Sequence, residues 1–241
     1  MAAEKKMFVV KAGSTFPDMA ESLGDFEHWI IDGLGIRRDR ITVVDAEKEK
    51  ELPGPEMALG IVISGAHAMV TEEQGWSLAL ERWVREFVEA GVPVLGICYG
   101  HQILARAMGG AADYHPGGAE IGTVDIHCLP EAGEDVLFKT LPSVFKGHVV
   151  HSQTVTRLPE DAVLLARNEF EPHHAFRVGE HAWGVQFHPE FSIPATRGYV
   201  HHMTATIQNQ GKDQDAILTS LEETPHASDL LRLFGRLAVG E

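Results

Sequence analysis

Short, uninterrupted hydrophobic runs alternate with amphipathic stretches through the first half of the chain. Four of these runs are typical of strands buried on both faces, at residues 7–11, 41–44, 59–63 and 92–97. Between the third and the fourth run, hydrophobic residues recur at helical spacing and predict a helix over residues 74–90 with one apolar face. Strands that alternate with helices predict an α/β fold in which helices cover a parallel sheet.

The second half of the chain has short strand patterns separated by Gly, Pro and acidic turns. Antiparallel strands that extend the sheet are expected at residues 122–129, 149–157, 162–166, 175–178 and 182–187. From residue 194 onward no strand pattern remains, and the chain is expected to end in helices. Because no repeat or Pro/Ser-rich linker occurs, we expect residues 1–191 to form one domain and residues 192–241 a helical extension packed on it.

Charge and hydrophobicity narrow the range of partners. The 241 residues contain 20 Lys and Arg against 35 Asp and Glu, a formal net charge of −15. A field of this sign repels nucleic-acid phosphates and anionic membrane surfaces, so neither is an expected partner. No uncharged run approaches the roughly 18 residues of a membrane helix, and the apolar run at residues 7–10 is too short for a signal peptide. We therefore expect a cytoplasmic protein.

A nucleophile motif stands at the end of the fourth predicted strand. Gly96 and Gly100 flank Cys98 in a Gly-x-Cys-x-Gly turn that joins the strand to a helix. A turn this tight leaves no space for side chains two residues before and after the nucleophile, and glycine has none. The helix N-terminus also favours a thiolate. Cys128 lies in a predicted strand without such flanks, so we interpret Cys98 as a nucleophile and Cys128 as a structural cysteine.

A nucleophilic cysteine requires a base, and the chain contains 14 histidines. His188 follows a buried strand pattern and precedes Glu190 by two residues, so both side chains point to the same side of an extended chain. Glu190 can then hold one imidazole nitrogen while the other faces the thiol. Alone, a His-Pro-Glu tripeptide is typical of a surface turn. Together with the elbow, it predicts a Cys-His-Glu triad.

Two segments carry a family resemblance. The sequences Gly-Ile-Cys-Tyr-Gly-His-Gln at 96–102 and Gly-Val-Gln-Phe-His-Pro-Glu-Phe at 184–191 resemble the class I (triad) glutamine amidotransferases, particularly the glutaminase domain of GMP synthase and its stand-alone relatives. The resemblance implies that Cys98 is the nucleophile, His188 the general base and acid, and Glu190 the carboxylate that orients it. It also implies a flavodoxin-like, open and mostly parallel sheet with helices on both faces.

The same resemblance implies an oxyanion hole. The family has a Gly-rich loop after its third strand, and Gly65 and Ala66 occupy that place here. A backbone N–H of Gly65 or Ala66 would join that of Tyr99 in stabilising negative charge on the substrate oxygen. Ala66 stands where the family has a second glycine. This departure leaves open whether the peptide can adopt the family's conformation, because alanine resists positive φ.

Substrate-binding residues are also implied by the resemblance. The segment His151, Ser152 and Gln153 resembles the one whose backbone holds the α-carboxylate of substrate glutamine, and Gln102 matches a side chain that contacts this substrate. Glu120 belongs to a stretch similar to one that supports the pocket wall.

The implied reaction is hydrolysis of the γ-amide of glutamine, or of a γ-glutamyl small molecule, through a γ-glutamyl thioester. Neither a metal nor an organic cofactor is expected. Two pairs of adjacent histidines, His173-His174 and His201-His202, diverge in direction, and no Cys or carboxylate at ligand spacing completes a metal site with them. We expect these four histidines to be solvated.

Three interpretations of the function stay open at this point. The sequence has no phosphate-binding loop with which to activate an acceptor, so it does not predict a complete synthetase. The chain could be a glutaminase subunit that supplies ammonia to a separate synthase. It could also act alone on a γ-glutamyl compound, which the helical tail favours. A DJ-1-like non-catalytic stress or binding protein would share the elbow cysteine but lack the late His-Pro-Glu segment.

Overall fold

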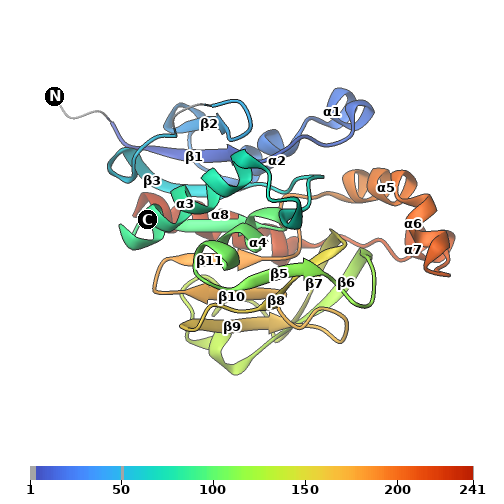
Figure 1. Cartoon of the computed structure of the whole chain (residues 1–241). Coiled ribbons are helices and arrows are strands. Elements are labelled where there is room, and N and C mark those ends of the chain that lie inside the picture. Colours follow the sequence, from blue (N-terminus) through green and yellow to red (C-terminus); the bar gives the residue numbers. More distant parts are fainter. Residues whose placement is uncertain (1–3, 50–51, 241) are drawn as a thin grey trace.

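The computed structural model describes residues 4–49 and 52–240 and is shown in Figure 1. Its strands are β1 (Lys6–Lys11), β2 (Ile41–Asp45), β3 (Ala58–Ile63), β4 (Val94–Ile97), β5 (Ala111–Tyr114), β6 (Glu120–Cys128), β7 (Val144–His151), β8 (Gln153–Arg157), β9 (Ala162–Arg167), β10 (Ala175–Val178) and β11 (Ala182–Val185). Its α-helices are α1 (Pro17–Leu23), α2 (Phe26–Leu34), α3 (Gly75–Glu89), α4 (Tyr99–Ala107), α5 (Ile193–His202), α6 (Thr204–Asn209), α7 (Gln214–Thr219) and α8 (Pro225–Val239).

The main sheet has a parallel half and an antiparallel half. Its strand order is β2-β1-β3-β4-β11-β10-β9-β6-β7, and the first five strands in this order run parallel to one another. From β11 onward neighbouring strands are antiparallel. The arrangement confirms the predicted α/β class, with an open parallel sheet and an antiparallel extension. Because β4 and β11 are parallel neighbours, their carboxyl ends, which carry the two predicted motifs, meet at one edge of the sheet.

Two details of the strand prediction are wrong. The expected strand at 149–157 is broken at Ser152: β7 stays in the main sheet, whereas β8 leaves it and pairs with β5 in a separate two-stranded sheet. The expected antiparallel strand at 182–187 is β11, which is antiparallel to β10 but returns to the parallel half beside β4. Both errors arise because hydrophobic alternation records burial but not which strand is the partner.

Two helical layers cover the sheet (Figure 1). On one face, α3 and α4 form a core with the small β5–β8 sheet. On the other face, α2 and α8 form the second core. The predicted helix at 74–90 is confirmed as α3, whose apolar residues Leu80, Trp83, Val84 and Phe87 are all buried.

The described part of the chain after Phe191 contains four helices and no strand, as predicted. Leu230, Leu231 and Phe234 of α8 are fully buried and belong to the core beneath the sheet. At Gly235 the helices approach so closely that a Cβ atom would come within 2.2 Å of the Leu34 carbonyl oxygen of α2. The last helix is therefore part of the fold's interior. The division of the chain into domains after residue 191 stays a prediction.

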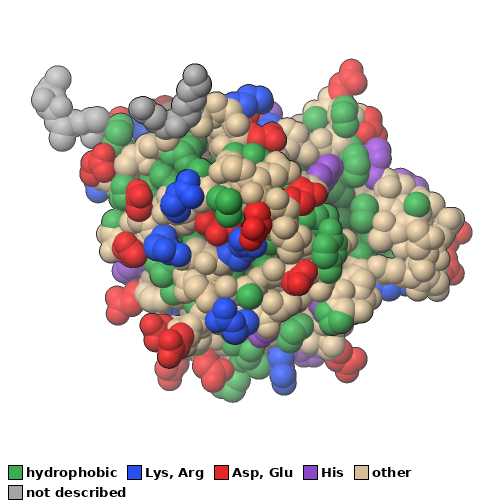
Figure 2. Space-filling view, viewed as in Figure 1, with side chains coloured by type: hydrophobic (Ala, Val, Ile, Leu, Met, Phe, Trp, Pro, Cys, Tyr) green, Lys and Arg blue, Asp and Glu red, His purple; other side chains and the backbone are tan. Residues whose placement is uncertain are grey.

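Helices α5, α6 and α7 project beyond the sheet on the side where α1 also lies (Figure 1). Hydrophobic and histidine side chains gather where this projection meets the rest of the molecule, whereas acidic side chains are spread over the visible face with basic ones among them (Figure 2). Within residues 4–49 and 52–240, no helix has both the length and the apolarity that a membrane span requires.

Candidate active site

Cys98 occupies a strained turn between β4 and α4. Its backbone has φ 50° and ψ −97°, a region that costs a residue with a side chain about 1–3 kcal/mol. The flanking glycines make the turn possible. A Cβ atom at Gly96 would come within 2.3 Å of the Gly100 carbonyl oxygen, and one at Gly100 within 2.5 Å of the Ile63 carbonyl oxygen. The turn therefore has the geometry of a nucleophile elbow, and its strain holds the cysteine at the edge of the sheet.

The Cys98 side chain faces a cavity of about 280 Å³. Its backbone N–H donates to the Val185 carbonyl oxygen at 2.8 Å, which ties the elbow to β11. The sulfur lies 3.8 Å from the Val150 carbonyl oxygen, and the residue retains 7% exposure. Cys98 is thus largely buried and is exposed only slightly, towards the cavity.

His188 and Glu190 form a buried pair beside this cysteine. Nδ1 of His188 lies 2.8 Å from Oε1 of Glu190, and the His188 N–H donates to the His148 carbonyl oxygen at 2.8 Å. The Phe191 ring stacks on the imidazole with centroids 4.0 Å apart. Burial by itself lowers the pKa of His188, but the negative charges of Glu190 and Cys98 and the hydrogen bonds to both raise it to about 10. The carboxylate beside it therefore favours the cationic form of the imidazole.

The Gly65–Ala66 peptide is held in a fixed orientation. The Ser64 hydroxyl donates to the Gly65 carbonyl oxygen at 2.8 Å and accepts from the Ala12 N–H at 3.0 Å. Since the peptide is trans, the Ala66 N–H points away from Ser64. Neither Gly65 nor Ala66 has a positive φ, so alanine is compatible with the conformation seen here.

Tyr99 begins α4, and its N–H is one of the backbone donors that the helix itself leaves free. The side chain points away to α3, where its hydroxyl donates to the Ser77 Oγ at 2.7 Å. Only the backbone of Tyr99 is thus available at the elbow. Gly65 lies beside His188, because a Cβ atom added to it would be 3.1 Å from Cε1 of that imidazole.

The fold brings most of the predicted site residues to one cavity. Those that line it are Ala66, Cys98, Tyr99, Gln102, His151, Ser152, Gln153 and His188. Gly65 and Glu190 are not among the lining residues, but Glu190 is bonded to His188 and Gly65 lies beside it. Phe16, Phe26, His67, Tyr199 and Met203 also line the cavity and were not predicted. Phe16 and Phe26 belong to the N-terminal segment and Tyr199 and Met203 to the helical tail, where the sequence shows no recognisable motif. His67 directly follows the Gly65–Ala66 loop, which the sequence does single out.

The polar wall of the cavity is built from interlocked amides. Nε2 of Gln102 donates to the Gln153 carbonyl oxygen at 2.9 Å and to Oε1 of Gln186 at 3.2 Å. The Gln153 side chain accepts from the Val70 N–H at 2.9 Å and donates to the Thr71 hydroxyl at 2.6 Å. These bonds fix the orientation of both amides before a ligand arrives.

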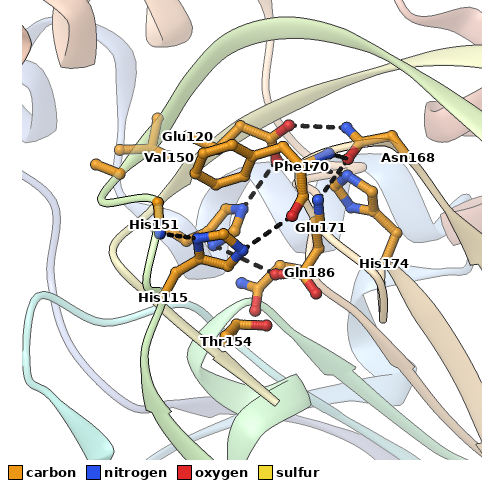
Figure 3. A network of polar contacts seen from close by, with 12 residues as sticks. His115, Glu120, Val150, His151, Thr154, Asn168, Phe170, Glu171, His174 and Gln186 are labelled. Atoms are coloured by element: carbon orange, nitrogen blue, oxygen red, sulfur yellow. Dashed lines mark hydrogen bonds and ion pairs between the residues drawn. The ribbon is translucent and has the colours of Figure 1, made fainter. Parts of the chain in front are cut away.

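A buried network supports this wall from behind (Figure 3). His151 places its two ring nitrogens 3.0 Å from the Gln153 carbonyl oxygen and 3.0 Å from Oε2 of Glu120. Asn168 donates to the other oxygen of Glu120 at 2.7 Å. Glu120 thus lies directly behind the wall. His174 also lies next to Glu120. Burial lowers the pKa of the His174 imidazole to about 3, although the Glu120 carboxylate opposes this shift.

The location of His174 corrects the expectation that the paired histidines are solvated. His174 is fully buried, and its Nε2 lies 3.5 Å from Oε2 of Glu120. His201 and His202 are exposed, as expected. Among residues 4–49 and 52–240, no group of three His, Cys, Asp or Glu side chains is arranged to hold a metal ion. Cys128 is half-buried on β6, and burial raises the pKa of its thiol to about 11.

The sequence of this chain is similar to those of known proteins. Residues 19–202 match the family described as glutamine amidotransferase class-I. The chain is 36% identical over 133 residues to the glutamine-hydrolyzing GMP synthase of Aeropyrum pernix, a match that covers 55% of this chain and 24% of the synthase. It is 29% identical over 199 residues to gamma-glutamyl peptidase 4 of Arabidopsis thaliana, covering 80% of this chain and 78% of the peptidase.

The fold has a close counterpart as well. The crystal structure of a glutamine amidotransferase from Thermotoga maritima superposes with a TM-score of 0.74, covering 99% of this chain and all of the other at 19% identity. The chain belongs to the class I glutamine amidotransferases, a family of enzymes, which confirms the resemblance seen in the two motifs. Its match spans only about a quarter of the GMP synthase, so the activity of that whole enzyme does not transfer with the family.

Proposed function

We propose that this protein hydrolyses the γ-amide of glutamine or of a γ-glutamyl compound, with Cys98, His188 and Glu190 as its catalytic triad. The observation that carries the proposal is the strained elbow, which presents Cys98 to a cavity next to an imidazole bonded to a buried carboxylate at 2.8 Å. A buried cysteine of purely structural use would not require backbone strain at the edge of the sheet.

The first half of the reaction forms a thioester. The imidazolium of His188 stabilises negative charge on the Cys98 sulfur, which attacks the γ-carbonyl carbon. The Ala66 and Tyr99 N–H groups stabilise the oxyanion of the tetrahedral intermediate, because both belong to backbone fixed at the cavity. His188 then gives its proton to the leaving nitrogen. The C–N bond breaks, the amine departs, and a γ-glutamyl thioester remains on Cys98.

The second half regenerates the enzyme. Neutral His188 removes a proton from a water molecule as the water oxygen attacks the thioester carbonyl. The tetrahedral intermediate expels the Cys98 thiolate and releases glutamate, so sulfur and imidazolium return to their starting charges. Glu190 stabilises the imidazolium before the first step and after the second. In this scheme the Gln102 side chain and the backbone of His151, Ser152 and Gln153 hold the γ-glutamyl group.

We favour an enzyme that acts alone on a γ-glutamyl compound. The similarity to the Arabidopsis gamma-glutamyl peptidase covers 80% of this chain, whereas the similarity to the GMP synthase covers 55%. The last helix also occupies the core under the sheet. The second candidate is a glutaminase subunit that supplies ammonia to a separate synthase, and the similarity to the glutamine-hydrolyzing GMP synthase supports it. The cytoplasmic location expected from the sequence stays a prediction.

Glutamate release from the purified protein tests the proposal. Glutamine, glutathione and a γ-glutamyl anilide are supplied separately, and Cys98→Ala protein serves as the control. We expect release from at least one compound by the wild type and none by the variant. Wild-type protein that releases glutamate from none of the three, alone or with cell extract, would refute the proposed function.

A further inference from the structure

The cavity has two walls of unlike chemistry. One wall is polar and holds the interlocked amides of Gln102 and Gln153 described above. The other is formed by Phe16 before α1, by Tyr199 in α5 and by Met203 just after α5. This second wall, called here the apolar wall and defined by Phe16, Tyr199 and Met203, comes from segments outside the two sequence motifs. The proposed mechanism uses none of its residues.

Contacts within the apolar wall fix its shape. The Phe16 ring stacks on His202 with centroids 3.8 Å apart and lies 4.4 Å from the ring of His67. The Tyr199 hydroxyl lies 2.9 Å from the Thr15 hydroxyl and 3.1 Å from Nε2 of His67. Because these two partners already engage the hydroxyl, Tyr199 offers mainly its ring to a ligand. The wall therefore presents preformed aromatic and thioether surface.

The apolar wall offers a carboxylate no charged partner. None of the described residues that line the cavity is Asp, Glu, Lys or Arg, and His151 belongs to the polar side, where its Nε2 lies 3.0 Å from Oε2 of Glu120. His67 is exposed on one side, and desolvation of the rest lowers the pKa of its imidazole below the ordinary 6.5, so it is neutral at pH 7. His202, whose ring stacks on the Phe16 ring, lies 3.0 Å from the Asp18 carboxylate. A carboxylate placed against the apolar wall would lose water and gain no charged partner.

We infer that the apolar wall is the binding subsite for the leaving group, and that it takes an uncharged aromatic or branched aliphatic amine. Amino acids and peptides, whose free carboxylate would be desolvated there, are the poorer leaving groups. The inference rests on the proposed function, since it assigns the departing half of the substrate in that reaction. The polar wall then binds the γ-glutamyl half of the substrate.

A matched pair of substrates isolates the carboxylate. The compounds γ-glutamyl-phenethylamide and γ-glutamyl-phenylalanine share the γ-glutamyl group and the phenyl ring and differ only in one carboxylate on the leaving group. We expect kcat/KM for the phenethylamide to exceed that for the phenylalanine compound by about tenfold or more, because only the second must desolvate an unpaired anion. Glutamine, which has no group to contact the wall, is expected to be a slower substrate than the phenethylamide.

A variant that adds a cation to the wall tests the same point from the protein's side. Met203→Lys should lower the ratio of the two kcat/KM values towards one or below, because the ammonium can pair with the carboxylate. Met57→Lys is the control: Met57 is 40% exposed and precedes β3, at the opposite end of that strand from the cavity, so this variant should keep the wild-type ratio. Should Met203→Lys fail to fold, His67→Lys places the charge at an exposed position on the cavity lining.

The outcomes separate this inference from the function on which it rests. A wild-type ratio near or below one, with measurable hydrolysis of glutamine or either compound, would overturn the subsite assignment and leave the proposed function standing. A ratio unchanged by the added lysine at the wall would do the same. Absence of glutamate release from glutamine and from both compounds would refute the proposed function and this inference with it.

Discussion

Replacement of Glu190 by glutamine probes the electrostatics of the triad. The glutamine side chain would keep the size of the original and a polar atom near Nδ1 of His188, but it would remove the negative charge. His188 is largely buried, and burial lowers the pKa of its imidazole, so the high pKa depends on the charges of Glu190 and Cys98. The substitution therefore lowers the share of His188 that is protonated.

The structure indicates the size of the effect. The pKa of His188 lies at about 10 instead of the ordinary 6.5, and at about 1.4 kcal/mol per pH unit this difference corresponds to about 5 kcal/mol in favour of the imidazolium. Glu190 is the largest of the contributions that raise it. Without this charge, we expect the pKa of His188 to fall. A smaller share of the variant would then hold the proton that the leaving amine requires.

The pH dependence of kcat/KM for a γ-glutamyl substrate measures this directly. In the wild type the alkaline limb should lie near pH 10, because the imidazolium loses its proton there. In Glu190→Gln we expect this limb to move to lower pH, and the rate at pH 8 to fall by about 10²- to 10⁴-fold while remaining measurable. Glu180→Gln, a change at a side chain that is 89% exposed, should leave the profile as in the wild type.

An alkaline limb that stays in place in Glu190→Gln would contradict this reasoning. It would mean that the Glu190 carboxylate does not control the proton on His188. A lowered rate with an unchanged pH profile would likewise indicate that Glu190 only positions the imidazole.

Three further predictions concern the thiols, the oxyanion loop and the substrate. Brief iodoacetamide treatment followed by peptide mass spectrometry should label Cys98 before Cys128, since Cys128 has a raised thiol pKa of about 11; preferential labelling of Cys128 would argue against the elbow. Ser64→Ala should lower kcat by about tenfold with little change in KM, because it frees the Gly65–Ala66 peptide, whereas exposed Ser143→Ala should not; a change in KM alone would place Ser64 outside the oxyanion hole. Purified protein should show a higher kcat/KM for γ-glutamyl compounds whose leaving amine is larger than ammonia than for glutamine, with little change on adding cell extract; glutaminase activity that appears only with a co-purifying protein would support the subunit alternative.

The parts of the site that the sequence predicts are those in which chemistry is local. Gly96 and Gly100 reveal the elbow because steric crowding two residues from Cys98 admits only glycine. His188 and Glu190 reveal their pairing because the spacing of two places both side chains on one side of the chain. In each case neighbouring residues alone determine the geometry.

The parts of the site and fold that the sequence does not predict depend on contacts between segments that are distant in the chain. Phe16 and Tyr199 meet at the cavity although 183 positions separate them, and neither lies in a distinctive local pattern. The break at Ser152 has no glycine or proline to mark it, and the residues on both sides are buried, so the strand pattern continues through it. In the sequence His174 is one of two adjacent polar residues, yet the turn before β10 places it beneath Glu120.

The central claim is that Cys98 supplies the nucleophile. Its most direct test is glutamate release by Cys98→Ala, measured beside wild type and the matched Cys128→Ala variant, with thermal unfolding to confirm that all three are folded. We predict that Cys98→Ala releases no glutamate from any γ-glutamyl compound and that Cys128→Ala retains wild-type turnover. Wild-type turnover by a folded Cys98→Ala protein would contradict the account.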